Sequence, residues 1–99
     1  MAVQTIIYGF SGDAVSTATL GAAASTAEIV LGNDQIFIIT CAGDFHVKFG
    51  NSGMAAAAAT DFQFAANSVV ALQTGDHTDR IRVFSTAGGV YWIQKLDRS

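Results

Sequence analysis

The chain has 99 residues, of which 51% are hydrophobic and only 13% charged, whereas an ordinary soluble domain carries roughly 25% charged residues. Its net charge of −3 argues against nucleic acid as the main ligand, because phosphate binding requires clustered Lys and Arg. A domain of this mass exposes about 5,000 Å², so we expect part of this weakly charged surface to be buried against other subunits. Alternatively, small and neutral polar residues simply form the surface.

Residues 1–34 are predicted to form N-terminal strands joined by a segment of small residues. Residues 3–10 are rich in β-branched and aromatic side chains and are predicted to be a strand, ended by a turn at Ser11-Gly12-Asp13. Residues 14–26 are nearly all Ala, Ser, Thr and Gly, which favours an extended arm or surface loop over a stable element. Residues 27–31 are predicted to be the next strand.

Residues 35–96 are predicted to form a core β-module, which makes residues 1–99 a single domain. Its most informative stretch is 45–49, in which apolar and polar residues alternate with the period of a half-buried strand, as Phe45-His46-Val47-Lys48-Phe49. Residues 35–41 are apolar on both faces, as in a central strand or one that a partner covers. The short link between these two segments predicts a hairpin.

The rest of the chain continues the same pattern. The alanine run Ala55–Ala59 is compatible with either a short helix or an extended segment that another backbone approaches closely. Further short strands are predicted at 62–64, 68–74, 80–84 and 90–96, separated by turn residues. The sequence therefore predicts an all-β fold, a small antiparallel sandwich or jelly-roll-like barrel of about seven to eight short strands.

Few residues could take part in catalysis or metal binding, and none of them forms a known motif. Asp76, His77 and Asp79 could hold a divalent ion, but their spacing fits no known loop and favours a solvated turn. His46 is expected at the surface or in an interface, and Cys41, the single cysteine, in the core. No nucleophile elbow or nucleotide-binding glycine pattern is found. We therefore expect no enzyme activity, no catalytic residue, no cofactor and no metal.

Tyr91 and Trp92 are adjacent on a predicted strand, so they point to opposite faces. We expect Trp92 in the core and Tyr91 facing outward, where it would suit a subunit interface or a stacked sugar. The chain begins without the basic region of a secretory signal, and no apolar run reaches the length of a transmembrane helix. We therefore expect synthesis in a cytoplasm.

Residues 35–96 resemble small structural proteins of tailed bacteriophages. The resemblance is carried by Phe45–Gly50, the Ala-rich segment Met54–Asp61, Phe64-Ala65-Ala66-Asn67, Val70, Ile81-Arg82-Val83 and Gly89-Val90. It implies a β-rich virion protein made in the host cytoplasm, a capsid decoration or cement subunit that forms homo-oligomers, most often trimers, and contacts the major capsid or another virion protein. The alternative is a carbohydrate-binding sandwich of a tail or adhesin. The expected interface residues are Leu20, Phe37, Ile39, Phe84 and Tyr91.

Overall fold

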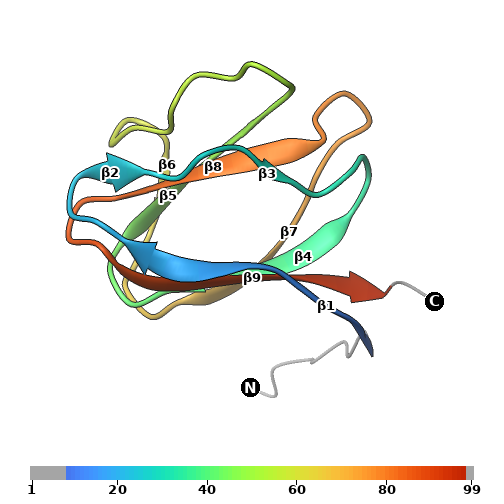
Figure 1. The fold of residues 1–99 in the computed structure, drawn as a ribbon, viewed down its shortest axis with the longest axis horizontal. Coiled ribbons are helices and arrows are strands. Elements are labelled where there is room, and N and C mark those ends of the chain that lie inside the picture. The colour runs from blue at the N-terminus through green and yellow to red at the C-terminus, as the bar shows by residue number, and fades with distance from the viewer. Residues whose placement is uncertain (1–8, 98–99) are drawn as a thin grey trace, which may run out of the picture.

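The computed structural model describes residues 9–97, which form strands and no helix (Figure 1). One antiparallel sheet, sheet A, has the strand order β1-β9-β4-β7, and the other, sheet B, has the order β2-β8-β5-β6 with β3 also paired to β8. The all-β, antiparallel prediction is confirmed. The strands are β1 (Gly9–Leu20), β2 (Ala24–Ser25), β3 (Ile29–Val30), β4 (Ile36–Cys41), β5 (Phe45–Gly50), β6 (Phe62–Phe64), β7 (Val69–Gln73), β8 (Arg80–Ser85) and β9 (Gly89–Asp97).

The core lies between the two sheets and follows from the alternation of side chains along each strand. In β4 and β8 every second residue is buried, and the residues between them are half-buried, as expected for strands with one face on a core. Sheet A contributes Phe37, Ile39, Cys41, Tyr91 and Ile93, and sheet B contributes Phe45, Val47, Ile81 and Val83. β4 lies between β9 and β7, so of the two alternatives for residues 35–41 the structure shows a central strand.

The N-terminal prediction is wrong in two respects, the turn at 11–13 and the arm at 14–26. The expected strand over residues 3–10 lies almost wholly outside the described residues, but the expected turn at 11–13 is part of β1, which continues to Leu20. The small residues 14–26 are therefore no arm: they supply most of β1 and β2, and Thr26 is buried. Pairing with β9 and β8 gives these residues the backbone hydrogen bonds that their composition alone did not predict.

The expected hairpin between residues 35–41 and 45–49 is also wrong. β4 pairs with β7 and β9, whereas β5 pairs with β6 and β8, so residues 42–44 carry the chain from one sheet to the other. The connection that contains Gly88 likewise joins β8 to β9 in the opposite sheet. The physical reason is that both flanking strands have an apolar face, which is buried when the strands face each other across the core.

The connections between the sheets stack against one another at one end of the sandwich, on the left in Figure 1. The Ala23 N–H donates to the Thr86 carbonyl, the Ala87 N–H to the Asp44 carboxylate, and the Asn67 N–H to the Cys41 carbonyl. Each connection thus binds the next one across the end of the molecule.

Candidate functional site

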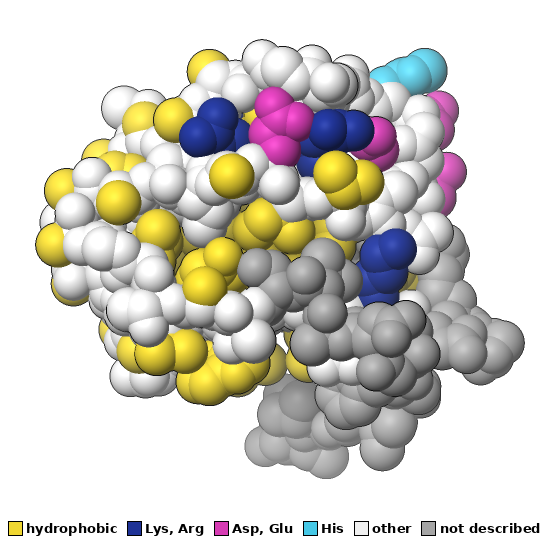
Figure 2. All heavy atoms as spheres, in the orientation of Figure 1, with side chains coloured by type: hydrophobic (Ala, Val, Ile, Leu, Met, Phe, Trp, Pro, Cys, Tyr) yellow, Lys and Arg dark blue, Asp and Glu magenta, His cyan; other side chains and the backbone are white. Residues whose placement is uncertain are grey.

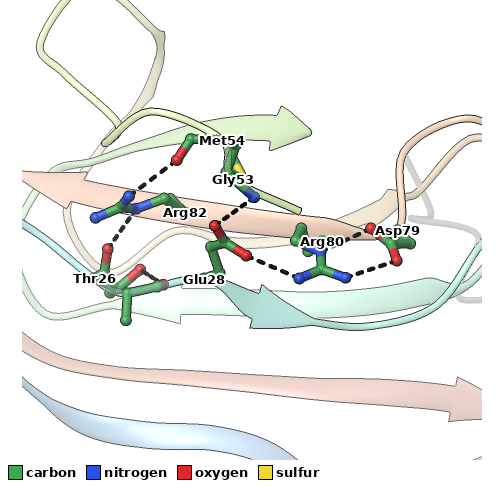
Figure 3. A network of polar contacts seen from close by, with 8 residues as sticks. Thr26, Glu28, Gly53, Met54, Asp79, Arg80 and Arg82 are labelled. Atoms are coloured by element: carbon green, nitrogen blue, oxygen red, sulfur yellow. Dashed lines mark hydrogen bonds and ion pairs between the residues drawn. The ribbon is translucent and has the colours of Figure 1, made fainter. Parts of the chain in front are cut away.

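Arg80 on β8 is the centre of a charged network on the outer face of sheet B (Figure 3). Its guanidinium donates to both carboxylate oxygens of Asp79, at 2.8 and 3.0 Å, and to Glu28 at 2.8 Å. The same Glu28 carboxylate accepts a hydrogen bond from the Gly53 N–H at 2.9 Å. Hydrogen bonding to Arg80 lowers the pKa of Glu28 and of Asp79 below their ordinary values. The network therefore joins three parts of the chain.

Arg82, two residues further along β8, binds the same segments through backbone oxygens. Its side chain donates to the Thr26 carbonyl at 2.8 Å and to the Met54 carbonyl at 3.2 Å, as Figure 3 shows. The Thr26 hydroxyl in turn accepts from the Val83 N–H. Since each donor of Arg80 and Arg82 named here already has a partner within the chain, these arginines hold the fold together.

The segment after β5 covers the outer face of sheet B. The Ala57 N–H donates to the Ser25 hydroxyl, and His46 Nδ1 lies 2.9 Å from the Asp61 carbonyl oxygen. The alanine run is irregular rather than helical, which settles the alternative that its sequence left open: small side chains let its backbone lie against β2. The prediction that His46 lies at the surface or in an interface is wrong, because this segment of its own chain buries it. Figure 2 shows basic and acidic side chains in a row on this side of the molecule.

The outer face of sheet A has a different character. Tyr91 and Ile93 are buried in β9, so the residues that alternate with them, such as Trp92, face outward. The register places Thr17, Trp92, Thr40 and Val69 in one row across the four strands. Trp92 is 51% exposed and Val69 67% exposed. None of the described outward side chains on this face is charged: Thr17, Thr19, Ile36, Ile38, Thr40, Val69, Ala71, Gln73, Val90, Trp92, Gln94 and Leu96.

The prediction that Trp92 lies in the core and Tyr91 faces outward is wrong. Tyr91 is buried and Trp92 is exposed, because the β9 register places Tyr91 beside Cys41 and Ile93 beside Ile39 on the core side. Phe84 is half-buried on the opposite sheet, with its ring 5.6 Å from that of His46. The three aromatic residues therefore do not form one exposed cluster, which is the arrangement that would have favoured a sugar site.

Most of the residues expected in an interface are buried within the subunit. Leu20, Phe37, Ile39 and Tyr91 belong to the core, and Phe84 packs against His46. Their role in an interface stays a prediction, but the exposed residues Trp92, Val69 and Phe62 have more surface to offer a partner. No local signal identifies these three residues. The outward positions of Trp92 and Val69 follow from the register between strands, and Phe62 has the parity of a core residue because it lies opposite Val47.

An apolar groove of about 330 Å³ lies between the sheets where β6 and β7 form their edges. It is lined by Val47, Phe49, Phe62, Phe64 and Leu72. Phe62 is opposite the core residue Val47 in the β5–β6 register, and yet 74% of it is exposed. The core is therefore uncovered at this edge.

The polar residues considered as metal ligands do not form a binding site. Asp79 is bound to Arg80, while Asp76 and His77 form a solvent-exposed pair at 3.7 Å. No group of three potential metal ligands occurs in the part of the chain that the structure describes. Nor does that part contain a helix long and apolar enough to cross a membrane.

Comparison of the chain with protein-family models, with curated proteins and with solved structures found no match. What the chain does must therefore be inferred from its own surfaces.

Proposed function

We propose that the chain is a structural subunit of a bacteriophage virion, a decoration or cement protein that binds the shell and copies of itself and catalyses no reaction. The observation that carries this proposal is the outer face of sheet A, on which none of the described side chains is charged and Trp92 and Val69 are exposed. Broad apolar surfaces rimmed by neutral polar groups are typical of protein interfaces. The virion as the location, and a trimer as the oligomer, rest on the resemblance of residues 35–96.

For the fold we propose a jelly roll. The strand orders β1-β9-β4-β7 and β2-β8-β5-β6 support it, because they place eight strands in two facing sheets when the two-residue strands β2 and β3 count as one interrupted strand. The connections that cross between the sheets at one end are also in keeping with it. Jelly rolls occur in both viral capsid proteins and lectins, so the fold alone does not decide between assembly and sugar binding.

Sugar binding is the second candidate, and one observation favours it. Trp92 is an exposed ring between Thr17 and Thr40 in the sheet register, and a ring with neighbouring hydroxyl groups suits a stacked sugar. Against it, Tyr91 and Phe84 do not lie on the same exposed surface. Apolar residues such as Val69 and Ile38 continue the face beyond the tryptophan, which suits a protein partner better.

The test is to look for the protein in virions. Particles made from the genome that encodes the chain are purified, and their proteins are identified and counted by quantitative mass spectrometry. We expect many copies per particle, present in a fixed ratio to the major shell protein. Absence of the chain from the particles would overturn the proposal, and binding of the purified chain to a defined glycan in its place would favour the sugar alternative.

A further inference from the structure

The edges of the two sheets differ in how well they are protected. Exposed edges invite pairing with another chain, and natural proteins block them with short strands, bulges or charges. The β1 edge has register shifts, β2 and β3 have two residues each, and β6 has three. β7 has five residues, Val69–Gln73, in unbroken register with β4 and without a charge or a proline. Among the described strands, β7 is the edge that lacks such protection.

The free backbone groups of β7 can be assigned from its register. The Thr74 N–H donates to the Gln35 carbonyl at 2.9 Å, which makes these two residues a hydrogen-bonded pair. Hydrogen-bonded and non-bonded pairs alternate along an antiparallel ladder. The backbone groups of Val70 and Leu72 therefore point toward β4, and those of Val69, Ala71 and Gln73 point toward the open edge. This edge is a template for one more strand.

On the core side of the same edge, apolar side chains are exposed to solvent. Phe62 faces the space between the sheets, beside Phe64 and Leu72, but most of its ring is exposed. A strand added to β7 would extend sheet A over this groove, and its inward side chains would lie toward Phe62. Burying such a ring stabilises an interface, since an aromatic side chain removes on the order of 150 to 250 Å² from water.

We propose that β7 pairs antiparallel with β7 of a second copy of this chain, about a two-fold axis at Ala71. In this register Ala71 faces Ala71 of the second copy, Val69 faces Gln73, and Leu72 faces Val70. The inference deepens the proposed function and rests on its self-association, to which it assigns a two-fold pair in place of the trimer that the resemblance implies. A second copy fits because neither β7 nor the groove carries a charged residue. In a chain with a net charge of −3, neutral edges can meet without like-charge repulsion.

The size of the contact predicts a weak pairing. A standard interface buries about 800 Å² on each partner, a substantial part of the 5465 Å² surface of this chain. An edge of five residues with one exposed ring buries less. Pairing in solution should therefore appear only at tens to hundreds of micromolar, and display of many copies on a shell would strengthen it through effective concentration.

Charge reversal at Ala71 tests the pairing. Ala71 is exposed on the outer face, so A71K and A71E should both fold, but each would place like charges opposite one another at the axis. Sedimentation velocity from about 10 µM to 1 mM should show the mass of the unmodified chain doubling. Each variant should associate at least tenfold more weakly, and an equimolar mixture of A71K and A71E should associate again. The control T17K puts the same charge on the same face at the opposite edge strand, and it should associate normally.

Three results would overturn the pairing: an unmodified chain that does not associate, A71K and A71E variants that associate as well as the unmodified chain, or a T17K variant that is equally impaired. The inference and the proposed function can fail separately. A chain found in virions that does not associate through β7 would overturn the pairing alone. A chain that pairs through β7 but is absent from virions would overturn the proposed function alone.

Discussion

Gly43 lies directly against Gly88, with the backbone of the β4–β5 connection packed on the carbonyl oxygen of the β8–β9 connection. A Cβ atom on Gly43 would overlap that oxygen and would also reach the Ser85 hydroxyl. Gly88 itself has a positive φ of 80° and lies against the backbone of the β1–β2 connection. The stacked connections therefore depend on glycine at both positions, because no side chain fits between them.

We accordingly expect G43A to destabilise the protein strongly. The added methyl group meets backbone atoms, which cannot rotate away, so the free energy of unfolding should fall by at least about 2 kcal/mol. The measurement is urea unfolding followed by circular dichroism. G21A is the matched control, because its Cβ would meet only Ala24 at an ordinary 3.8 Å, and it should change stability by less than about 1 kcal/mol. Equal stability of the two variants would contradict this packing.

Acid should weaken the network around Arg80. The pKa of Glu28 and of Asp79 is lowered in the folded state, first by hydrogen bonding to Arg80, so folding favours their ionised forms. Their contribution to stability is full above the unfolded pKa of about 4, and it is lost as the pH falls through the folded pKa. The urea midpoint should therefore fall as the pH is lowered toward 3.

Two arginine variants separate this effect from general acid sensitivity. R80M removes the partner of both carboxylates, so its urea midpoint should depend less on pH below about 5 than that of the unmodified chain. R82M loses bonds to the backbone oxygens of Thr26 and Met54. It should be less stable at every pH but keep most of the acid dependence. If the urea midpoint of R80M depends on pH as that of the unmodified chain does, the ionisation of Glu28 and Asp79 does not contribute to the acid sensitivity.

Cys41 should react slowly with thiol reagents in the native state. Its side chain is 1% exposed, on the core side of β4, so labelling requires at least local opening of the sheet. The native protein should label orders of magnitude more slowly than the chain in urea. The double variant C41A/A42C moves the thiol to the neighbouring, exposed position and should label at once. Similar rates for both thiols would mean that this end of the sandwich opens readily.

The sequence predicts most strands of the fold but not how they are joined. Alternation along residues 45–49 is a local signal, and these residues and residues 80–84 form strands as predicted. The choice between a hairpin and a crossing connection at residues 42–44 is not local, since it depends on Cys41 and Phe45 joining the same core from opposite sheets. The outer positions of Trp92 and Val69 likewise depend on the register between strands, which a single strand does not reveal.

Replacing Trp92 should impair binding to a partner and leave the fold intact. The side chain is half-exposed on sheet A between Thr17 and Thr40, so W92A should change the free energy of unfolding by less than about 1 kcal/mol. On the proposed shell surface, the ring would be a central apolar anchor, and its loss should weaken attachment to particles at least tenfold.

Trp92 also reports on that binding directly, because it is the single tryptophan of the chain. Covering the outer face of sheet A with shell protein should shift its emission to shorter wavelength, as the indole leaves water. V30A is the matched control: Val30 is 56% exposed but lies on β3 at the edge of sheet B, so this variant should attach normally. If W92A attaches as well as the unmodified chain, and the emission does not shift on binding, the shell contacts another face of the protein.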